Sequence, residues 1–146
     1  MSIKRLILFL LLVVSVGCEN TTNKVPSYPV YMDLNILSMY PHFVPDNGYQ
    51  TMCFVKKRYE YELIGYAGVL VWVSMDGRYY AADMCCSSCL DRNSPVEPDG
   101  LFAVCPLCGE QYDLSYGLAN PTQGVSRQPL RRFGTRMQGG ILQIRN

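Results

Sequence analysis

Two paired-cysteine segments constrain the fold of this chain more than any other feature of its sequence. Their spacing is Cys86-x2-Cys89-x15-Cys105-x2-Cys108, and five of the seven cysteines fall between positions 85 and 108. A C-x-x-C pair in a tight loop directs two thiolates at one ion while backbone N–H groups face the sulfurs. Because two such loops supply four ligands, the spacing predicts that they meet in the folded chain.

Three kinds of site are compatible with this spacing. Four thiolates can hold a structural zinc ion or a [2Fe–2S] cluster, and in an oxidising compartment the same cysteines can form two disulfides. A disulfide from Cys86 to Cys105 or from Cys89 to Cys108 would close the two loops on each other, and the spacing leaves the connectivity open. Gly109 follows the second loop, where the chain must leave by an unusual backbone angle.

The first 17 residues have the pattern of a signal peptide. A short basic start precedes the apolar run Leu6–Val14, and small residues lead to Cys18. The apolar run is too short to cross a bilayer as a helix, which needs about 20 residues. We therefore expect Met1–Gly17 to be a leader that is removed on export.

The step Val16-Gly17-Cys18 resembles a bacterial lipobox, although Ser15 stands where that pattern usually has leucine. The resemblance implies that cleavage leaves Cys18 as an acylated N-terminal residue, and several acyl chains would anchor it stably. The alternative is ordinary secretion, with Cys18 free or disulfide-bonded. We expect a lipid-anchored protein of the bacterial cell envelope, on the periplasmic side or the outer-membrane surface.

Residues 18–27 are expected to form the lipid anchor and a flexible tether without structure, because this segment is polar and ends near Pro26. Lys4 and Arg5 leave with the leader, so the 13 basic side chains fall to 11 against 12 acidic ones. A net charge near −1 offers no concentrated basic face for nucleic acid. The expected partners are the membrane, reached through the lipid, and an unidentified envelope protein.

The remaining residues, 28–146, are expected to form one all-β domain, a small antiparallel β sandwich. Tyrosine is plentiful at 11, and 12 glycines and nine prolines suit short strands joined by tight turns. Asp76-Gly77 between two β-rich runs is a strong hairpin signal, because glycine accepts positive φ. The predicted strands are 28–36, 51–66, 68–74, 78–82, 101–104, 111–114, 132–137 and 141–145.

The surroundings of the cysteines resemble the Rieske iron–sulfur domains over roughly residues 66 to 146. In that family a segment ending in Cys-Pro-His is followed some fifteen to seventeen residues later by Cys-Pro-x-His-Gly, and then by a stretch like Phe-Asp-Leu-x-x-Gly. Residues 82–88 would lie on the first loop and 105–109 on the second, with 111–117 after it. The resemblance implies that 121–130 caps the site, that 131–144 forms the closing strands, and that 82–130 is the metal-loop region.

The sequence departs from that family at the ligands. The two family cysteines correspond to Cys86 and Cys105, but the two histidine positions hold Ser88 and Cys108. A Rieske centre uses two histidines on one iron, so this chain cannot build that centre. Cys89 and Cys108 are the available replacements for the missing pair.

Three further residues bear on the site. Cys85 points away from Cys86 on an extended chain and is a buried small residue, a disulfide partner or a spare ligand. Cys53 is interpreted as an ordinary strand residue. His42, the only histidine, is interpreted as a surface loop residue, because no motif with a cysteine, serine or carboxylate accompanies it.

The leading hypothesis is a lipoprotein whose Rieske-like domain holds a [2Fe–2S] cluster or zinc at Cys86, Cys89, Cys105 and Cys108, without being a catalyst itself. With iron–sulfur, the family resemblance implies one-electron transfer; with zinc, the site would be structural. The alternative is a cofactor-free envelope interaction module stapled by disulfides.

Overall fold

The computed structural model describes residues 22–146, so the leader, Cys18 and residues 19–21 lie outside the described part of the chain. The described residues are nearly all β, in two antiparallel sheets, which confirms the predicted fold class. Two short helical segments, α2 (Ile36–Met39) and η1 (Pro45–Asn47), follow the first strand. No helix in the described part of the chain is long and apolar enough to span a bilayer.

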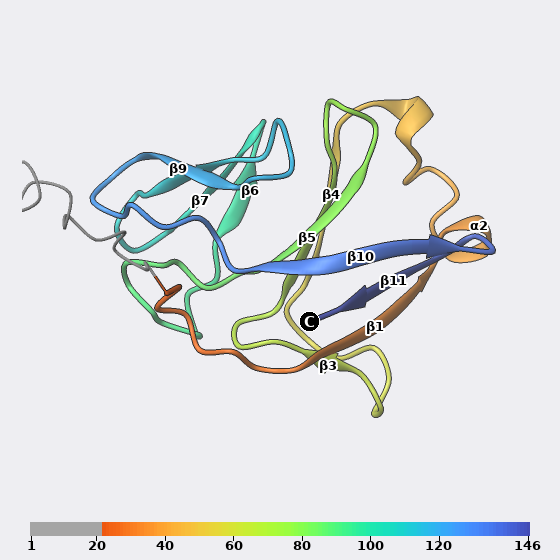
Figure 1. Ribbon diagram of the computed structural model, residues 1–146, viewed down its shortest axis with the longest axis horizontal. Coiled ribbons are helices and arrows are strands. Elements are labelled where there is room, and N and C mark those ends of the chain that lie inside the picture. The colour runs from red at the N-terminus through yellow and green to blue at the C-terminus, as the bar shows by residue number, and fades with distance from the viewer. Residues whose placement is uncertain (1–21) are drawn as a thin grey trace, which may run out of the picture.

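The larger sheet has seven strands in the order β2-β4-β5-β10-β11-β1-β3. They are β1 (Val30–Asn35), β2 (Gln50–Phe54), β3 (Leu63–Ile64), β4 (Val69–Val73), β5 (Tyr79–Asp83), β10 (Arg132–Gln138) and β11 (Ile141–Arg145). In Figure 1 β4 and β5 stand in the middle of the molecule, with β10, β11 and β1 to their right. The predicted C-terminal hairpin is β10 and β11, in which Gln138 pairs with Ile141.

The smaller sheet has four strands in sequence order, β6-β7-β8-β9. They are β6 (Glu97–Asp99), β7 (Phe102–Val104), β8 (Gln111–Asp113) and β9 (Asn120–Gln123). This sheet lies to the left of β4 and β5 in Figure 1. The second cysteine loop connects β7 to β8, so the smaller sheet sets the position of Cys105 and Cys108.

The hairpin of β4 and β5 forms where Asp76-Gly77 predicts it. Trp72 pairs with Tyr80 and Val73 with Tyr79, and the Ser74 N–H donates to the carbonyl oxygen of Arg78 at 3.0 Å. Gly77 has a φ of 74°, a conformation that costs glycine little because it has no Cβ. After β5 the chain continues directly into the first cysteine loop.

Strand β4 is buried on both faces, and each face contributes to a different hydrophobic core. Val69, Val71 and Val73 belong to the core enclosed by the larger sheet. Leu70 and Trp72 belong to the core shared with the smaller sheet. Because alternate side chains of a strand point to opposite faces, the uninterrupted apolar run of β4 joins the two sheets.

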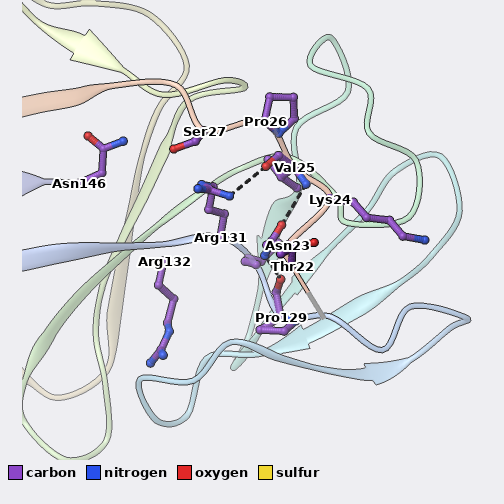
Figure 2. Close-up of a pocket in the computed structure, with 11 residues that line it drawn as sticks. Thr22, Asn23, Lys24, Val25, Pro26, Ser27, Pro129, Arg131, Arg132 and Asn146 are labelled. Atoms are coloured by element: carbon purple, nitrogen blue, oxygen red, sulfur yellow. Dashed lines mark hydrogen bonds between the residues drawn. The ribbon is translucent and has the colours of Figure 1, made fainter. Parts of the chain in front are cut away.

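The segment before β1 contradicts part of the expected tether. Val25 is only 1% exposed and lies in the core that contains Cys85 and Cys86. Its carbonyl oxygen accepts a hydrogen bond from Arg131 Nη1 at 3.0 Å, beside a hollow of about 690 Å³ (Figure 2). Part of the segment expected to be a tether, residues 23–25, therefore packs on the domain through one buried apolar side chain and hydrogen bonds.

The predicted strand over residues 51–66 is interrupted between β2 and β3. There Arg58 donates from its backbone N–H to Glu62 Oε2 at 2.8 Å and from Nε to Glu62 Oε1 at 3.0 Å. Arg58 Nη2 also donates to the Asp33 carbonyl oxygen at 2.9 Å, and Glu62 is fully buried. Burial opposes ionisation of Glu62, but the hydrogen bonds from Arg58 outweigh it and lower the pKa of that carboxyl. A buried ion pair thus fixes this turn against β1.

Replacing Arg58 by alanine is expected to lower the free energy of unfolding by about 3 kcal/mol, because a buried carboxylate loses its partner. Since the ion pair lowers the pKa of Glu62, its contribution to the free energy of unfolding is present above the ordinary carboxyl pKa. That contribution is lost as the pH falls through the pKa of Glu62 in the folded state. Urea unfolding of Arg58→Ala at neutral and acidic pH measures both effects. Lys57→Ala, at an exposed neighbouring position, is the control, and equal stability of the two variants would contradict the assignment.

Candidate metal centre

The two cysteine loops have the same local structure. In the first, the Leu90 N–H donates to the Cys86 carbonyl oxygen at 3.0 Å; in the second, the Gly109 N–H donates to the Cys105 carbonyl oxygen at 2.9 Å. Leu90 and Gly109 both have positive φ, 55° and 75°, and each follows the second cysteine of its loop. The unusual backbone angle expected at Gly109 is confirmed, and the first loop adopts a similar turn without glycine.

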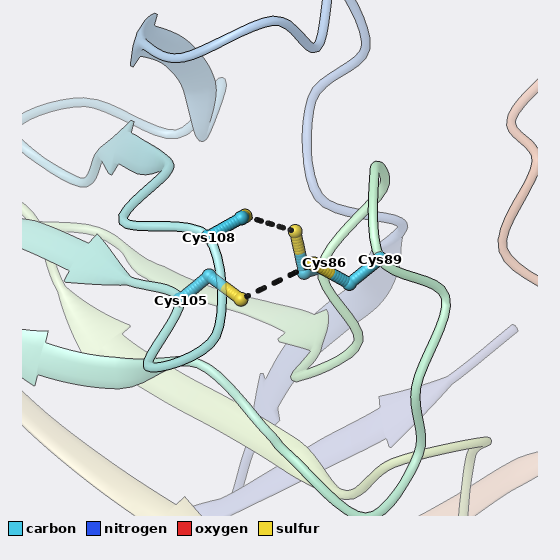
Figure 3. A group of neighbouring side chains, drawn as sticks. All are labelled: Cys86, Cys89, Cys105 and Cys108. Carbon is cyan, nitrogen blue, oxygen red and sulfur yellow. Dashed lines mark hydrogen bonds between the residues drawn. The ribbon is translucent and has the colours of Figure 1, made fainter.

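The four cysteines of these loops lie together, as their spacing predicts. All four sulfurs are within 4.8 Å of one another, and Figure 3 shows each loop presenting its two side chains to the other loop. Cys86 Sγ is 3.7 Å from Cys108 Sγ, and Cys105 Sγ is 3.8 Å from Cys89 Sγ. Cys86 and Cys105 are buried, Cys89 is half-buried and Cys108 is exposed.

These separations fit a single tetrahedral metal ion. A zinc–thiolate bond is about 2.3 Å long, so two sulfurs on one tetrahedral zinc stand about 3.8 Å apart. Two of the six sulfur–sulfur separations, 3.7 and 3.8 Å, agree with that value, and all six are within 4.8 Å. These two contacts are far longer than a disulfide bond of about 2.05 Å, so the loops are arranged as four separate sulfur donors.

Backbone N–H groups face the sulfur of Cys105. Burial alone would raise the pKa of the Cys105 thiol, but the N–H groups of Cys108 and Leu107 and the neighbouring cysteines outweigh it and lower that pKa. Burial raises the pKa of Cys86 despite a hydrogen bond with Tyr112. The site therefore favours a thiolate at Cys105, the form that binds metals.

Tyr112 is a residue of the site that the cysteine spacing did not identify. It is fully buried on β8, and its hydroxyl oxygen accepts a hydrogen bond from the Ser87 N–H at 3.0 Å. The same hydroxyl lies 3.3 Å from Cys86 Sγ and 2.9 Å from Ser87 Oγ. Burial, with a further contribution from Cys86, raises the pKa of Tyr112, so the phenol stays protonated and can donate to the sulfur.

Glu110 is a second buried polar residue beside the sulfurs. Its Oε2 lies 3.5 Å from Cys86 Sγ, and its Oε1 accepts a hydrogen bond from the Ser126 N–H. Gly124 approaches the same side chain so closely that an added Cβ would lie 2.8 Å from Glu110 Cγ. The segment 124–128 is thereby fastened beside the second cysteine loop.

The same segment also binds the first cysteine loop. Ser87 Oγ contacts Ser126 Oγ at 2.7 Å and donates to the Gln128 carbonyl oxygen at 2.9 Å. The Gln128 side chain in turn accepts from the Lys24 N–H at 3.0 Å. Residues 124–128 therefore connect both loops to the N-terminal segment, within the range that the Rieske resemblance implied to be the capping loop.

The other candidate residues do not belong to the group of four sulfurs. Cys85 is buried with its sulfur 3.5 Å from the Cys86 carbonyl oxygen, and burial raises the pKa of its thiol to about 12. Cys53 is exposed on β2, as expected of an ordinary strand residue. His42 is exposed in the loop after α2, where its carbonyl oxygen accepts from Asn47 Nδ2 at 2.8 Å.

Comparisons with known proteins assign no family to the chain. No protein-family model matches it, and no curated protein matches it. Among solved structures, a ferredoxin from Sphingomonas yanoikuyae B1 is similar at 16% sequence identity and a TM-score of 0.41, over 60% of this chain and 80% of that one. So distant a likeness carries no argument about function, and the candidate site rests on its own geometry.

Removing the Tyr112 hydroxyl is expected to destabilise the cysteine region. In Tyr112→Phe the Ser87 N–H loses its acceptor while it stays buried, which costs about 1–3 kcal/mol. Urea unfolding followed by the fluorescence of Trp72, the only tryptophan, measures the change. Tyr116→Phe is the control because that side chain is 59% exposed. A free energy of unfolding unchanged from wild type in Tyr112→Phe would show that the hydroxyl does not support the loop.

Proposed function

We propose that this chain is an envelope lipoprotein whose β domain is held together by one zinc ion, bound by the thiolates of Cys86, Cys89, Cys105 and Cys108. The observation that carries the proposal is the arrangement of the four sulfurs, all within 4.8 Å of one another. Four protein ligands leave no open position for a substrate. The zinc is accordingly structural, and the domain is a binding module rather than a catalyst.

The role of the ion follows from the positions of its ligands. Two of the four cysteines come from the loop after β5 in the larger sheet, and two from the loop between β7 and β8 in the smaller sheet. A metal ion bound by both loops ties the two sheets together at this edge. Because such a site exists only in the folded chain, the free energy of metal binding adds to the free energy of folding.

The second candidate is a [2Fe–2S] cluster that transfers single electrons to an envelope partner. Two features favour it: the resemblance of the loops to Rieske domains, and the exposure of Cys108, which would bring the cluster to the surface. The sulfur geometry favours zinc instead. In a [2Fe–2S] cluster, sulfurs bound to different irons are also separated by the distance between the two irons, so they lie further apart than sulfurs bound to one ion. The two cysteine loops would have to move apart to hold such a cluster.

The proposed location rests on the leader sequence. Cleavage at the lipobox-like step before Cys18 would leave that residue acylated, with only residues 19–21 before the segment that packs on the domain. The domain would therefore be held close to the membrane rather than on a long tether. We propose an envelope protein as its partner and no nucleic acid, in keeping with the net charge of the mature chain.

Elemental analysis of the full-length chain, expressed with its own leader and purified from the envelope, should find about one zinc per chain and no visible absorption band. About two irons per chain with visible charge-transfer bands would instead establish the electron-transfer candidate. Metal-free protein with oxidised cysteines that binds neither zinc nor iron after reduction would contradict both and support a disulfide-stapled module.

Matched cysteine variants extend this measurement. Cys105→Ser and Cys108→Ser should each lose the metal and lower the thermal unfolding midpoint, because three thiolates no longer complete the tetrahedral site. Cys53→Ser removes an exposed cysteine outside the site and should keep both the metal and the midpoint. Equal metal content in all three variants would rule out the four-thiolate site.

The anchor has its own test. The intact mass of the purified protein should exceed that of residues 18–146 by the mass of the acyl chains, and the protein should sediment with the membrane fraction. Cys18→Ser should abolish the added mass and leave an unprocessed precursor, whereas Cys53→Ser should change neither. An unmodified Cys18 in the wild type would show ordinary secretion instead.

A further inference from the structure

We propose that the four-cysteine site is also a redox site, at which a small-molecule disulfide oxidises the four thiolates to two disulfides, Cys86–Cys108 and Cys89–Cys105, and displaces the metal. The inference rests on the proposed zinc centre and goes beyond it. It assigns a reaction to the site and a specific pairing to its cysteines, which their spacing leaves open.

All four sulfurs lie within 4.8 Å of one another, and the proposed pairing uses two of the contacts between the loops. Cys86 Sγ and Cys108 Sγ are 3.7 Å apart, and Cys105 Sγ and Cys89 Sγ are 3.8 Å apart. Each pair joins one cysteine of the first loop to one of the second. A disulfide bond of about 2.05 Å therefore needs only a small closing movement of the two loops toward each other.

Each pair also combines one more exposed cysteine with one buried cysteine. Cys108 is exposed and Cys89 half-buried, whereas their partners Cys86 and Cys105 are no more than 1% exposed. Thiol–disulfide exchange requires access to the attacking sulfur, so a small oxidant meets Cys108 or Cys89 first. The buried partner, already in contact, then completes the protein disulfide.

The reaction balances as two successive exchanges at each pair. The Cys108 thiolate attacks the oxidant disulfide, forms a mixed disulfide and expels one small thiolate; the Cys86 thiolate then attacks Cys108 sulfur and expels the second. Cys89 and Cys105 react in the same way with a second oxidant molecule. Four protein thiolates are oxidised, two oxidant disulfides are reduced to four thiolates, and the metal leaves as a divalent cation.

The pairing preserves the connection that the metal provides. Both disulfides run between the two loops, so they tie together the same segments as the ion. The contact of Ser87 Oγ with Ser126 Oγ and the hydrogen bond from the Ser126 N–H to Glu110 involve no cysteine sulfur and remain available. Pairing within each loop, Cys86 with Cys89 and Cys105 with Cys108, would leave the loops unconnected. The oxidised domain is thus expected to stay folded without metal, which suits an exported protein.

The test treats the full-length zinc-loaded protein with glutathione disulfide and follows zinc release with a colorimetric chelator. Disulfides are mapped by mass spectrometry after digestion under acidic, non-reducing conditions. Samples stopped early report which cysteines carry glutathione. The Cys53→Ser variant, treated in parallel, excludes pairing through the exposed cysteine outside the site.

The expected result is one zinc released for every two protein disulfides, with Cys86 joined to Cys108 and Cys89 to Cys105. Glutathione should appear early on Cys108 or Cys89 and not on Cys86 or Cys105, and circular dichroism should keep its β signal after the metal has left. Disulfides within each loop, the pairing of Cys86 with Cys105, or zinc retained throughout oxidation would each overturn the proposal.

Failure of the redox proposal is distinguishable from failure of the zinc proposal. Purified protein that holds no metal and takes up no zinc after its cysteines are reduced contradicts the zinc centre before any oxidant is added. Its reduced form, treated in the same way, still reports the pairing, and any other pairing overturns the redox assignment independently. Zinc-loaded protein that resists oxidation leaves the structural zinc centre in place and removes only the redox reaction.

Discussion

The two-sided burial of β4 is the constraint on which the rest of the structure depends. Its five residues are fully buried and alternate between two cores, with Val71 in the one and Leu70 and Trp72 in the other. One strand therefore fixes the position of the smaller sheet against the larger one. The core that receives Leu70 and Trp72 also contains Cys86 and Cys105, so the packing that joins the sheets also brings the two cysteine loops together.

Two buried carboxylates satisfy backbone groups that the sheets leave without partners. Asp83 accepts hydrogen bonds from the N–H groups of Tyr66 at 2.6 Å, Ala67 at 3.1 Å and Cys85 at 2.9 Å, and Glu110 accepts from Ser126. Burial raises the pKa of Asp83, and these N–H groups offset part of that rise. Because a buried N–H without a partner is costly, each carboxylate fixes a segment beside the cysteine loops. The geometry of the sulfurs thus depends on neighbours that are not ligands.

The elements that the sequence predicted correctly are those whose conformation is determined by residues within the element itself. The Asp76-Gly77 turn and the two C-x-x-C loops carry their signals locally, and the structure contains all three. Strands β6 and β9 were missed because each contains a proline, at 98 and 121, which marks a turn in a sequence but is tolerated at the edges of a sheet. Val25 was missed for another reason: its burial depends on a core formed by residues far along the chain. The contacts of Tyr112 and Glu110 with Cys86 likewise arise only from tertiary structure.

The local symmetry of the two loops bears on what they hold. In the Rieske pattern the two ligands of the first loop are two positions apart and those of the second loop three, which makes the loops unequal. Here both loops place their cysteines three positions apart, and the residue after each pair takes a left-handed conformation. Leu90 adopts this conformation, with a φ of 55°, although it lacks the freedom of Gly109. Tertiary contacts must therefore offset the strain at Leu90. Two equivalent loops that face each other bring four sulfurs within 4.8 Å of one another, an arrangement that can hold a metal centre.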